Sequence, residues 1–178
     1  NSSYNRYHSD HKMSFETAKK LIDFYHAHSI DSEKIAIAFY GGEPLLEFEL
    51  IKRIVGYANE VFEGKPILYR MTTNATLFTD EAIEFFFDSG NDFFILISLD
   101  GPKSIQDKNR KFPNGKGSYD MILKNIQKIY NKNPENLKKL HFNTVIDPQN
   151  DYSEIVKILE HPLLKDVNFQ FNIIEHNG

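Results

Sequence analysis

The sequence predicts an α/β fold built on a parallel β-sheet. Apolar, strand-like runs alternate along the chain with segments whose apolar residues recur at helical spacing. Several runs, such as 93–97, are apolar almost throughout, which is expected of strands in a parallel sheet covered on both faces. Repeated strand-helix units imply right-handed crossovers, so the sheet is either open and doubly wound or part of a barrel.

The predicted elements of the first half follow from apolar spacing and turn residues. A helix begins after Ser14, a residue type that caps helix N-termini, and the run 35–40 is a strand. The next helix carries an apolar stripe formed by Leu46, Leu50, Ile51, Ile54, Val55 and Ala58. A strand around 67–71 follows. A third helix starts near Thr79 and stops at Gly90.

The second half continues the same alternation. The buried strand 93–97 is followed by a polar loop that leads to Ser118. The helix after it is marked by Met121, Ile122, Ile126, Ile129 and Tyr130. We expect a strand at 140–146, a helix at 152–159 and a last strand at 167–174.

Polar residues alternate with apolar ones in the last two strands. Asn168, Gln170 and Asn172 do so in one, and His141 and Asn143 do so in the other. Two interpretations remain open. The polar residues line a barrel interior wide enough for water or a ligand, or they form the solvated face of an edge strand.

The order of elements suggests that a strand precedes the chain. The first predicted element is a helix, whereas an α/β barrel normally starts with a strand, and residue 1 is Asn1 rather than Met. We therefore expect a first strand before Asn1. A length of 178 residues suits one domain, residues 1–178, with a buried core.

Composition argues against several classes of protein. The net charge is −4 and the pI is about 6.0, so no basic surface for nucleic acid is expected. No apolar run approaches the roughly 20 residues that cross a membrane, and no signal peptide is visible. The cysteine count is zero, which excludes thiolate metal ligands within this chain, and we expect no metal site. Neither a Walker loop nor a Gly-x-Ser-x-Gly elbow occurs.

Polar groups follow three of the predicted strands. They are the segments Gly41-Gly42-Glu43-Pro44, Thr73-Asn74 and Ser98-Leu99-Asp100. The carboxyl ends of parallel strands meet at one edge, where α/β proteins bind ligands. Glycine lets backbone approach a ligand closely, Glu43 can accept hydrogen bonds from an ammonium, and Arg110 can hold a carboxylate by a bidentate contact. Taken singly, the same residues also suit ordinary turns and the protein surface.

An ordered set of motifs resembles a known family. The segments are Phe39-Tyr40-Gly41-Gly42-Glu43-Pro44-Leu45, Thr72-Thr73-Asn74-Ala75-Thr76-Leu77, Ile97-Ser98-Leu99-Asp100-Gly101-Pro102 through Arg110, Gly115-Lys116-Gly117-Ser118-Tyr119 and Asn143-Thr144-Val145-Ile146. From about Met13 to its end, the chain resembles radical S-adenosylmethionine enzymes. The likeness is to the branch with C-terminal SPASM domains, which includes anaerobic sulfatase-maturating enzymes and thioether-forming peptide maturases.

The resemblance implies a partial (β/α)6 barrel, similar to a TIM barrel, that binds S-adenosylmethionine. By position, Gly41, Gly42 and Glu43, followed by Pro44, would hold the methionine ammonium. Ser98 and Arg110 match positions that contact the methionine carboxylate. Asp100 lies where contacts to the ribose or within the loop would fall, and Asn74 would line the same pocket. Val145 or Ile146 would border the adenine, and Asn143 is also expected among the cofactor-binding residues.

The chain departs from this family in one respect. The family holds a [4Fe–4S] cluster on a Cys-x-x-x-Cys-x-x-Cys loop, and the cluster reduces S-adenosylmethionine to give a 5′-deoxyadenosyl radical. With no cysteine, this chain cannot hold the cluster by thiolates. We therefore expect the core of a larger enzyme, itself inactive, lacking both the cysteine loop and the SPASM region.

The resemblance also implies partners and a location. They are a peptide or protein substrate, an electron donor such as flavodoxin or ferredoxin, and the cytoplasm, with no nucleic acid or membrane. Two alternatives remain. One is a degenerate binding module without redox chemistry, which retains a pocket for a nucleoside or a peptide. The other is a doubly wound nucleotide-binding domain, against which the missing Gly-x-Gly-x-x-Gly and Walker elements count.

Overall fold

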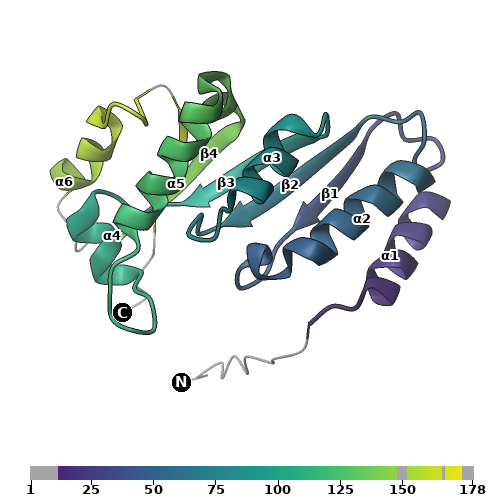
Figure 1. The fold of residues 1–178 in the computed structure, drawn as a ribbon, viewed down its shortest axis with the longest axis horizontal. Helices are drawn as coiled ribbons and strands as arrows, with labels where there is room; N and C mark the ends of the chain where they lie inside the picture. Colours follow the sequence, from purple (N-terminus) through teal and green to yellow (C-terminus); the bar gives the residue numbers. More distant parts are fainter. Residues whose placement is uncertain (1–11, 148–151, 166, 174–178) are drawn as a thin grey trace.

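The computed structural model describes residues 12–147, 152–165 and 167–173. Strands and helices alternate along the chain (Figure 1). The strands are β1 (Ile35–Phe39), β2 (Ile67–Thr73), β3 (Asp92–Ser98), β4 (Leu140–Ile146) and β5 (Asn168–Ile173). The α-helices are α1 (Phe15–Ala27), α2 (Phe48–Val61), α3 (Asp80–Asp88), α4 (Lys103–Asn109), α5 (Tyr119–Lys132) and α6 (Tyr152–Val156). The 3-10 helices are η1 (Pro44–Glu47), η2 (Pro134–Lys139) and η3 (Lys157–Glu160).

Caps and turn residues place the element ends. Ser14 accepts a hydrogen bond from the Thr17 amide at 3.1 Å, and Thr79 accepts one from the Ala82 amide at the same distance. Both residues therefore cap helices, as their positions predict. Pro44 opens η1 and not α2 directly, so the expected second helix is two helices in succession. The expected helix 152–159 is similarly α6 followed by η3.

The polar loop expected after β3 contains a helix that apolar spacing misses. Helix α4 holds Ile105 as its single buried apolar residue, so it shows no apolar stripe. Its other buried residue is Gln106, which belongs to a polar network at the strand ends. A short helix anchored by polar contacts leaves little hydrophobic pattern to detect.

The five strands form one parallel sheet in the order β1-β2-β3-β4-β5. The order follows the chain without reversal, whereas a doubly wound sheet reverses at a switch point. Right-handed crossovers between successive neighbours place all their helices on one face of the sheet. Figure 1 shows α2, α3 and α5 on the same side of the strands. The α/β class and the partial barrel are therefore confirmed, and the doubly wound alternative is wrong.

The hydrophobic core lies between the sheet and these helices. Alternate strand residues point into it and pack against the helical stripes. Phe86 of α3 meets Phe93 of β3 edge to face, with ring centroids 4.9 Å apart, and Tyr69 of β2 stacks on Phe93 at 5.1 Å. All three side chains are fully buried. This side of the strands provides the packing that holds the sheet together.

The intervening residues of each strand point to the opposite face, which we call the inner face. In-register neighbours in a parallel sheet share a face. The register therefore places the following residues there: Ala36, Ala38, Leu68, Arg70, Thr72, Asp92, Phe94, Leu96, Ser98, His141, Asn143, Val145, Asn168, Gln170 and Asn172. The polar residues of β4 and β5 meet on this face, where Asn172 donates a hydrogen bond to Asn143. Among the described strands β5 is the last of the sheet, and its polar residues lie on the inner face beside those of β4.

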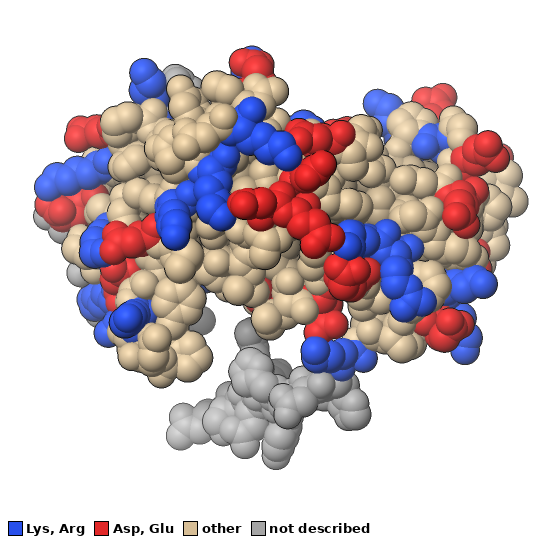
Figure 2. All heavy atoms as spheres, in the orientation of Figure 1, with Lys and Arg blue, Asp and Glu red and all other residues tan. Residues whose placement is uncertain are grey.

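Ion pairs connect the outer surfaces of neighbouring helices. Lys128 of α5 contacts Asp80 of α3 at 2.8 Å, and Lys52 of α2 reaches Glu81 of α3 at 2.6 Å. The face in Figure 2 accordingly shows Lys and Arg mixed with Asp and Glu. Within the described ranges, no helix has both the length and the apolar character needed to cross a membrane.

Candidate functional site

The candidate site lies at the carboxyl edge of the sheet, where β1 to β4 end. Gly41 and Gly42 follow β1 and are exposed. A Cβ added to either glycine would meet nothing within 4 Å, and neither has a positive φ. Neither internal packing nor turn geometry therefore requires glycine here. The two residues leave open space over bare backbone, which suits close approach by a ligand.

Glu43 joins the ends of β1 and β2. One oxygen, Oε1, accepts hydrogen bonds from the Leu45 amide at 3.1 Å and from the Thr73 hydroxyl at 2.6 Å. The other, Oε2, accepts the Asn74 amide at 2.8 Å. Because each carboxylate oxygen can accept about two hydrogen bonds, Oε2 keeps capacity for a ligand cation. The same side chain caps η1, which begins at Pro44.

The turn after β2 is fixed by side chains. Asn74 Oδ1 accepts hydrogen bonds from the Thr76 amide and hydroxyl, at 2.9 and 2.7 Å. Ala75 has a φ of 58°, and its carbonyl accepts a hydrogen bond of 2.9 Å from Asn125 of α5. The side-chain oxygen Oδ1 of Asn74 therefore stabilises its own turn. The side-chain nitrogen Nδ2 is the part of Asn74 that can face a ligand.

Ser98, Asn143 and Val145 lie together on the inner face. Ser98 is in register with Asn143, and both are half-buried. Val145 follows two residues later on β4, and its amide donates to Asp100 at 3.3 Å. The structure thereby brings three of the predicted site residues to adjoining positions on β3 and β4.

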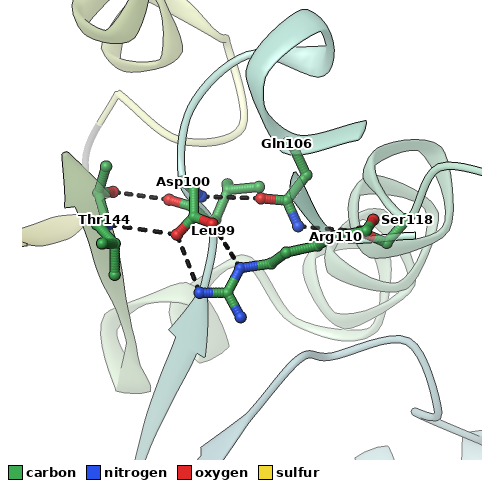
Figure 3. A network of polar contacts seen from close by, with 7 residues as sticks. Leu99, Asp100, Gln106, Arg110, Ser118 and Thr144 are labelled. Atoms are coloured by element: carbon green, nitrogen blue, oxygen red, sulfur yellow. Dashed lines mark hydrogen bonds and ion pairs between the residues drawn. The ribbon is translucent and has the colours of Figure 1, made fainter. Parts of the chain in front are cut away.

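Asp100 and Arg110 form a bidentate ion pair, shown in Figure 3. Arg110 Nε donates to Oδ2 at 2.6 Å, and Nη2 donates to Oδ1 at 3.1 Å. The Asp100 side chain is 6% exposed, whereas that of Arg110 is 36% exposed. Asp100 is therefore enclosed behind Arg110, and the guanidinium keeps its Nη1 edge available for an anion.

A second layer of buried polar groups holds this pair in place. The Asp100 amide donates to Gln106 Oε1 at 2.8 Å, and Gln106 Nε2 donates to Ser118 Oγ at 3.0 Å. Ser118 Oγ in turn donates to the Arg110 carbonyl at 2.8 Å. Thr144 donates to the Leu99 carbonyl at 2.7 Å (Figure 3). Closed networks of satisfied polar groups stiffen the backbone that carries them.

The loop after α4 is tied to α5 through Asp107. Its Oδ1 accepts the Tyr119 amide at 2.9 Å. A Cβ on Gly117 would lie 1.9 Å from Asp107 Cγ, so any larger residue there must displace the Asp107 carboxylate. Burial is the main cause that raises the pKa of Tyr119, whose phenol stays protonated at neutral pH.

Sequence reasoning named Thr73 among the polar groups at the strand ends, but it gave the other supporting residues no part in the site. They are Gln106, Ser118, Asn125 and Thr144, all buried. One signal was available: Asn125 lies on the apolar stripe of α5 beside Ile122 and Ile126. A polar residue at a core position implies a specific hydrogen-bond partner.

Comparison with known proteins shows to which family this chain belongs. The family model of the Radical SAM superfamily matches residues 2–161. The chain belongs to the radical SAM superfamily. Its cofactors are accordingly S-adenosylmethionine and, in the parent enzyme, a [4Fe–4S] cluster. No group of three or more His, Cys, Asp or Glu suited to a metal ion occurs within the described residues, and the chain has no cysteine.

Curated relatives of this radical SAM chain include two sulfatase-maturating enzymes. The serine-type anaerobic enzyme of Bacteroides thetaiotaomicron is 32% identical over 65% of this chain and 28% of its own length. The cysteine-type enzyme of Clostridium novyi is 34% identical over 56% of this chain and 26% of its own length. An uncharacterized protein of Methanocaldococcus jannaschii is 41% identical over 67% of this chain and 40% of its own length. The match thus spans less than half the length of each of these relatives.

Solved structures show the same fold. The structure of anSMEcpe with bound AdoMet and the Kp18Cys peptide superposes with a TM-score of 0.80. The two sequences are 20% identical, over 97% of this radical SAM chain and 46% of that one. Streptococcus suis SuiB matches with a TM-score of 0.61 at 19% identity, over 90% and 34% of the two chains.

The residues present fit one of the two groups that a radical SAM enzyme uses. Open glycine backbone, a carboxylate with spare acceptor capacity, a hydroxyl and a guanidinium edge meet at one sheet edge. They complement the ammonium and carboxylate of an amino-acid ligand. The cluster does not fit this chain, because its thiolate ligands are not among the 178 residues.

Proposed function

We propose that residues 1–178 form the S-adenosylmethionine-binding core domain of a radical SAM enzyme that modifies a peptide or protein substrate. The family assignment supports S-adenosylmethionine-dependent radical chemistry, and the sulfatase-maturating relatives support a protein substrate. The electron donor and a cytoplasmic location belong to the same proposal. The observation that carries it is the open backbone at Gly41 and Gly42, beside a carboxylate, a hydroxyl and an arginine.

Each residue of the site has a proposed part. The Gly41 and Gly42 carbonyls and Glu43 Oε2 hold the ligand ammonium, with the turn at Pro44 fixing their direction. Ser98 and the free edge of Arg110 hold the carboxylate. The remaining positions border the nucleoside: Asn74, Asn143 and Val145 by contact, and Asp100 through Arg110 and the Val145 amide. When bound, S-adenosylmethionine supplies the radical chemistry, and these residues orient it.

The test is a substitution that places a side chain in the open space over the two glycines. In the full-length, reconstituted enzyme under anaerobic reduction, we expect formation of 5′-deoxyadenosine. Gly42→Val should lower that rate at least about tenfold by blocking ligand approach. Gly56→Val is the matched control. It adds the same side chain at an exposed glycine of α2 that also has nothing within 4 Å.

The absence of 5′-deoxyadenosine from an enzyme with an intact cluster would overturn the proposal. Calorimetry would then decide the alternative, a binding module without redox chemistry. Such a module should bind S-adenosylmethionine or another nucleoside and lose that affinity in the Gly42→Val variant. Equal rates for Gly42→Val and Gly56→Val would remove the glycine pair from the site while leaving the family chemistry intact.

A further inference from the structure

The inner face of the sheet carries one cation among its described residues. Arg70 lies on β2 between Ala38 of β1 and Phe94 of β3, and its side chain is exposed. His141 also lies on this face, but burial lowers its pKa, so its imidazole is neutral at pH 7. The one acidic residue of the described inner face is Asp92, which begins β3 at the amino edge. No ion pair joins Asp92 to Arg70 in the described structure.

Aromatic stacking holds Arg70 in place. Its guanidinium carbon lies 5.4 Å from the Phe94 ring centroid, within the range of a cation–π contact. Phe94 in turn stacks on His141, with centroids 4.0 Å apart and planes 19° from parallel. Three strands therefore contribute to one row of side chains. A stacked guanidinium loses less freedom on binding an anion, because its plane is already set.

The row lies within reach of the candidate S-adenosylmethionine site. Phe94 and Ser98 are four residues apart on the same face of β3, or about 13 Å at roughly 3.3 Å per residue. Between them the inner face presents Leu96 with Thr72 and His141 in register, which are half-buried. Within the described residues, helices α2, α3 and α5 lie on the other side of the strands (Figure 1), so a polypeptide laid along the inner face would contact both the row and the strand ends.

We propose that Arg70, stacked on Phe94 and His141, binds an acidic side chain of the peptide substrate. This inference rests on the proposed function and names the substrate class: peptides with Asp or Glu near the modified residue. In an extended peptide at about 3.4 Å per residue, the separation corresponds to an acidic residue about two to five positions from the target. Arg70 is thus a specificity-determining residue on the inner face.

The experiment compares matched peptides on the full-length enzyme with S-adenosylmethionine present. Short fluorescein-labelled peptides with one target Ser or Cys carry Glu, Gln or Lys at a single neighbouring position. Anisotropy should show Glu peptides binding about ten to a hundredfold more tightly than Gln peptides. Arg70→Gln should abolish that preference, Arg70→Lys should keep part of it, and Arg70→Glu should favour the Lys peptide.

Arg53→Gln is the matched control variant. Arg53 lies over the Phe15 ring at 4.0 Å and is exposed, but it is on α2, on the helical side of the sheet. It should leave the Glu preference unchanged. Equal binding of Glu and Gln peptides by the wild-type enzyme at every position would overturn the inference, as would a preference that survives in Arg70→Gln.

Failure of the inference and failure of the proposed function give different results. Peptide anisotropy measures charge selection without turnover, whereas 5′-deoxyadenosine formation without peptide measures the radical chemistry. An enzyme that forms 5′-deoxyadenosine but shows no charge preference would remove the role of Arg70 alone. An enzyme that selects Glu peptides but forms no 5′-deoxyadenosine would remove the radical function alone.

Discussion

The contacts of Asp100 give this residue a structural role that differs from the ligand-binding role proposed for Arg110. Its carboxylate is engaged by Arg110 and by the Val145 amide, and its own amide is held by Gln106. Its side chain is 6% exposed. Asp100 therefore fixes the direction of Arg110 and links β3 to β4. Arg110, with its exposed edge, is the member of the pair that can reach a ligand.

Asp100→Asn tests this arrangement. An amide NH2 directed at the guanidinium replaces one charge-assisted bond with a repulsive contact. We expect the free energy of unfolding to fall by about 1.5–3 kcal/mol in urea titrations, with weaker S-adenosylmethionine binding by the full-length enzyme. Asp80→Asn is the control, since it removes an exposed partner of Lys128 and should change stability little. Equal losses in the two variants would contradict the assignment.

Sequence patterns identified the polar residues of the site but not their pairing. Asp100 and Arg110 stand out because polar groups gather at the ends of parallel strands. Whether an arginine meets a carboxylate or solvent depends on the path of the intervening chain. Here that path is set by α4, which has too few apolar residues for periodicity to reveal it. The roles assigned to the ten predicted site residues stay predictions.

At the scale of elements, the loop between α4 and α5 is fixed by one close approach. Gly117 lies against the Asp107 carboxylate, which accepts the first amide of α5. Lys111 and Gly117 also form an isolated antiparallel bridge across the loop. The loop therefore positions Arg110 at one end and α5 at the other, and α5 carries Asn125 to the turn after β2.

Two glycine-to-alanine variants separate the effect of close packing at Gly117 from the effect of helix propensity at Gly56. Gly117→Ala must displace Asp107 and should lower stability by about 1–2 kcal/mol. Gly56→Ala adds a methyl to an exposed position of α2 and should raise stability by about 0.5–1 kcal/mol. Urea unfolding midpoints of the two variants measure both effects. A Gly117→Ala protein as stable as the wild type would show that the contact is not needed.

At the scale of the whole molecule, the residue pattern alone did not predict the order of the strands in the sheet. Apolar strands separated by helices fit a doubly wound sheet and a barrel wall equally well. The difference lies in which earlier strand each new strand joins, and that depends on contacts between distant residues such as Phe86 and Phe93 with Tyr69. Motif order pointed to the barrel, and the sheet confirms it.

The acid stability of the molecule should depend on His141. In the unfolded chain a histidine has a pKa near 6.5, and desolvation lowers the pKa of His141 in the fold. The unfolded chain then binds more protons, so the free energy of unfolding should fall as pH drops below about 6.5. His141→Gln should remove that part of the pH dependence.

The measurement is a series of urea unfolding curves across mildly acidic pH. A His141→Gln profile that parallels the wild type would refute the role of His141.

The two faces of the sheet have separate roles, and directed evolution can use this separation. The residues that bury the hydrophobic core and the residues of the inner face alternate along the same strands. A library randomised at Thr72, Leu96 and Gln170 leaves the packed layer untouched, so most of its members should still fold. New substrate preferences can then be selected with little loss of stability, because recognition and folding draw on different side chains.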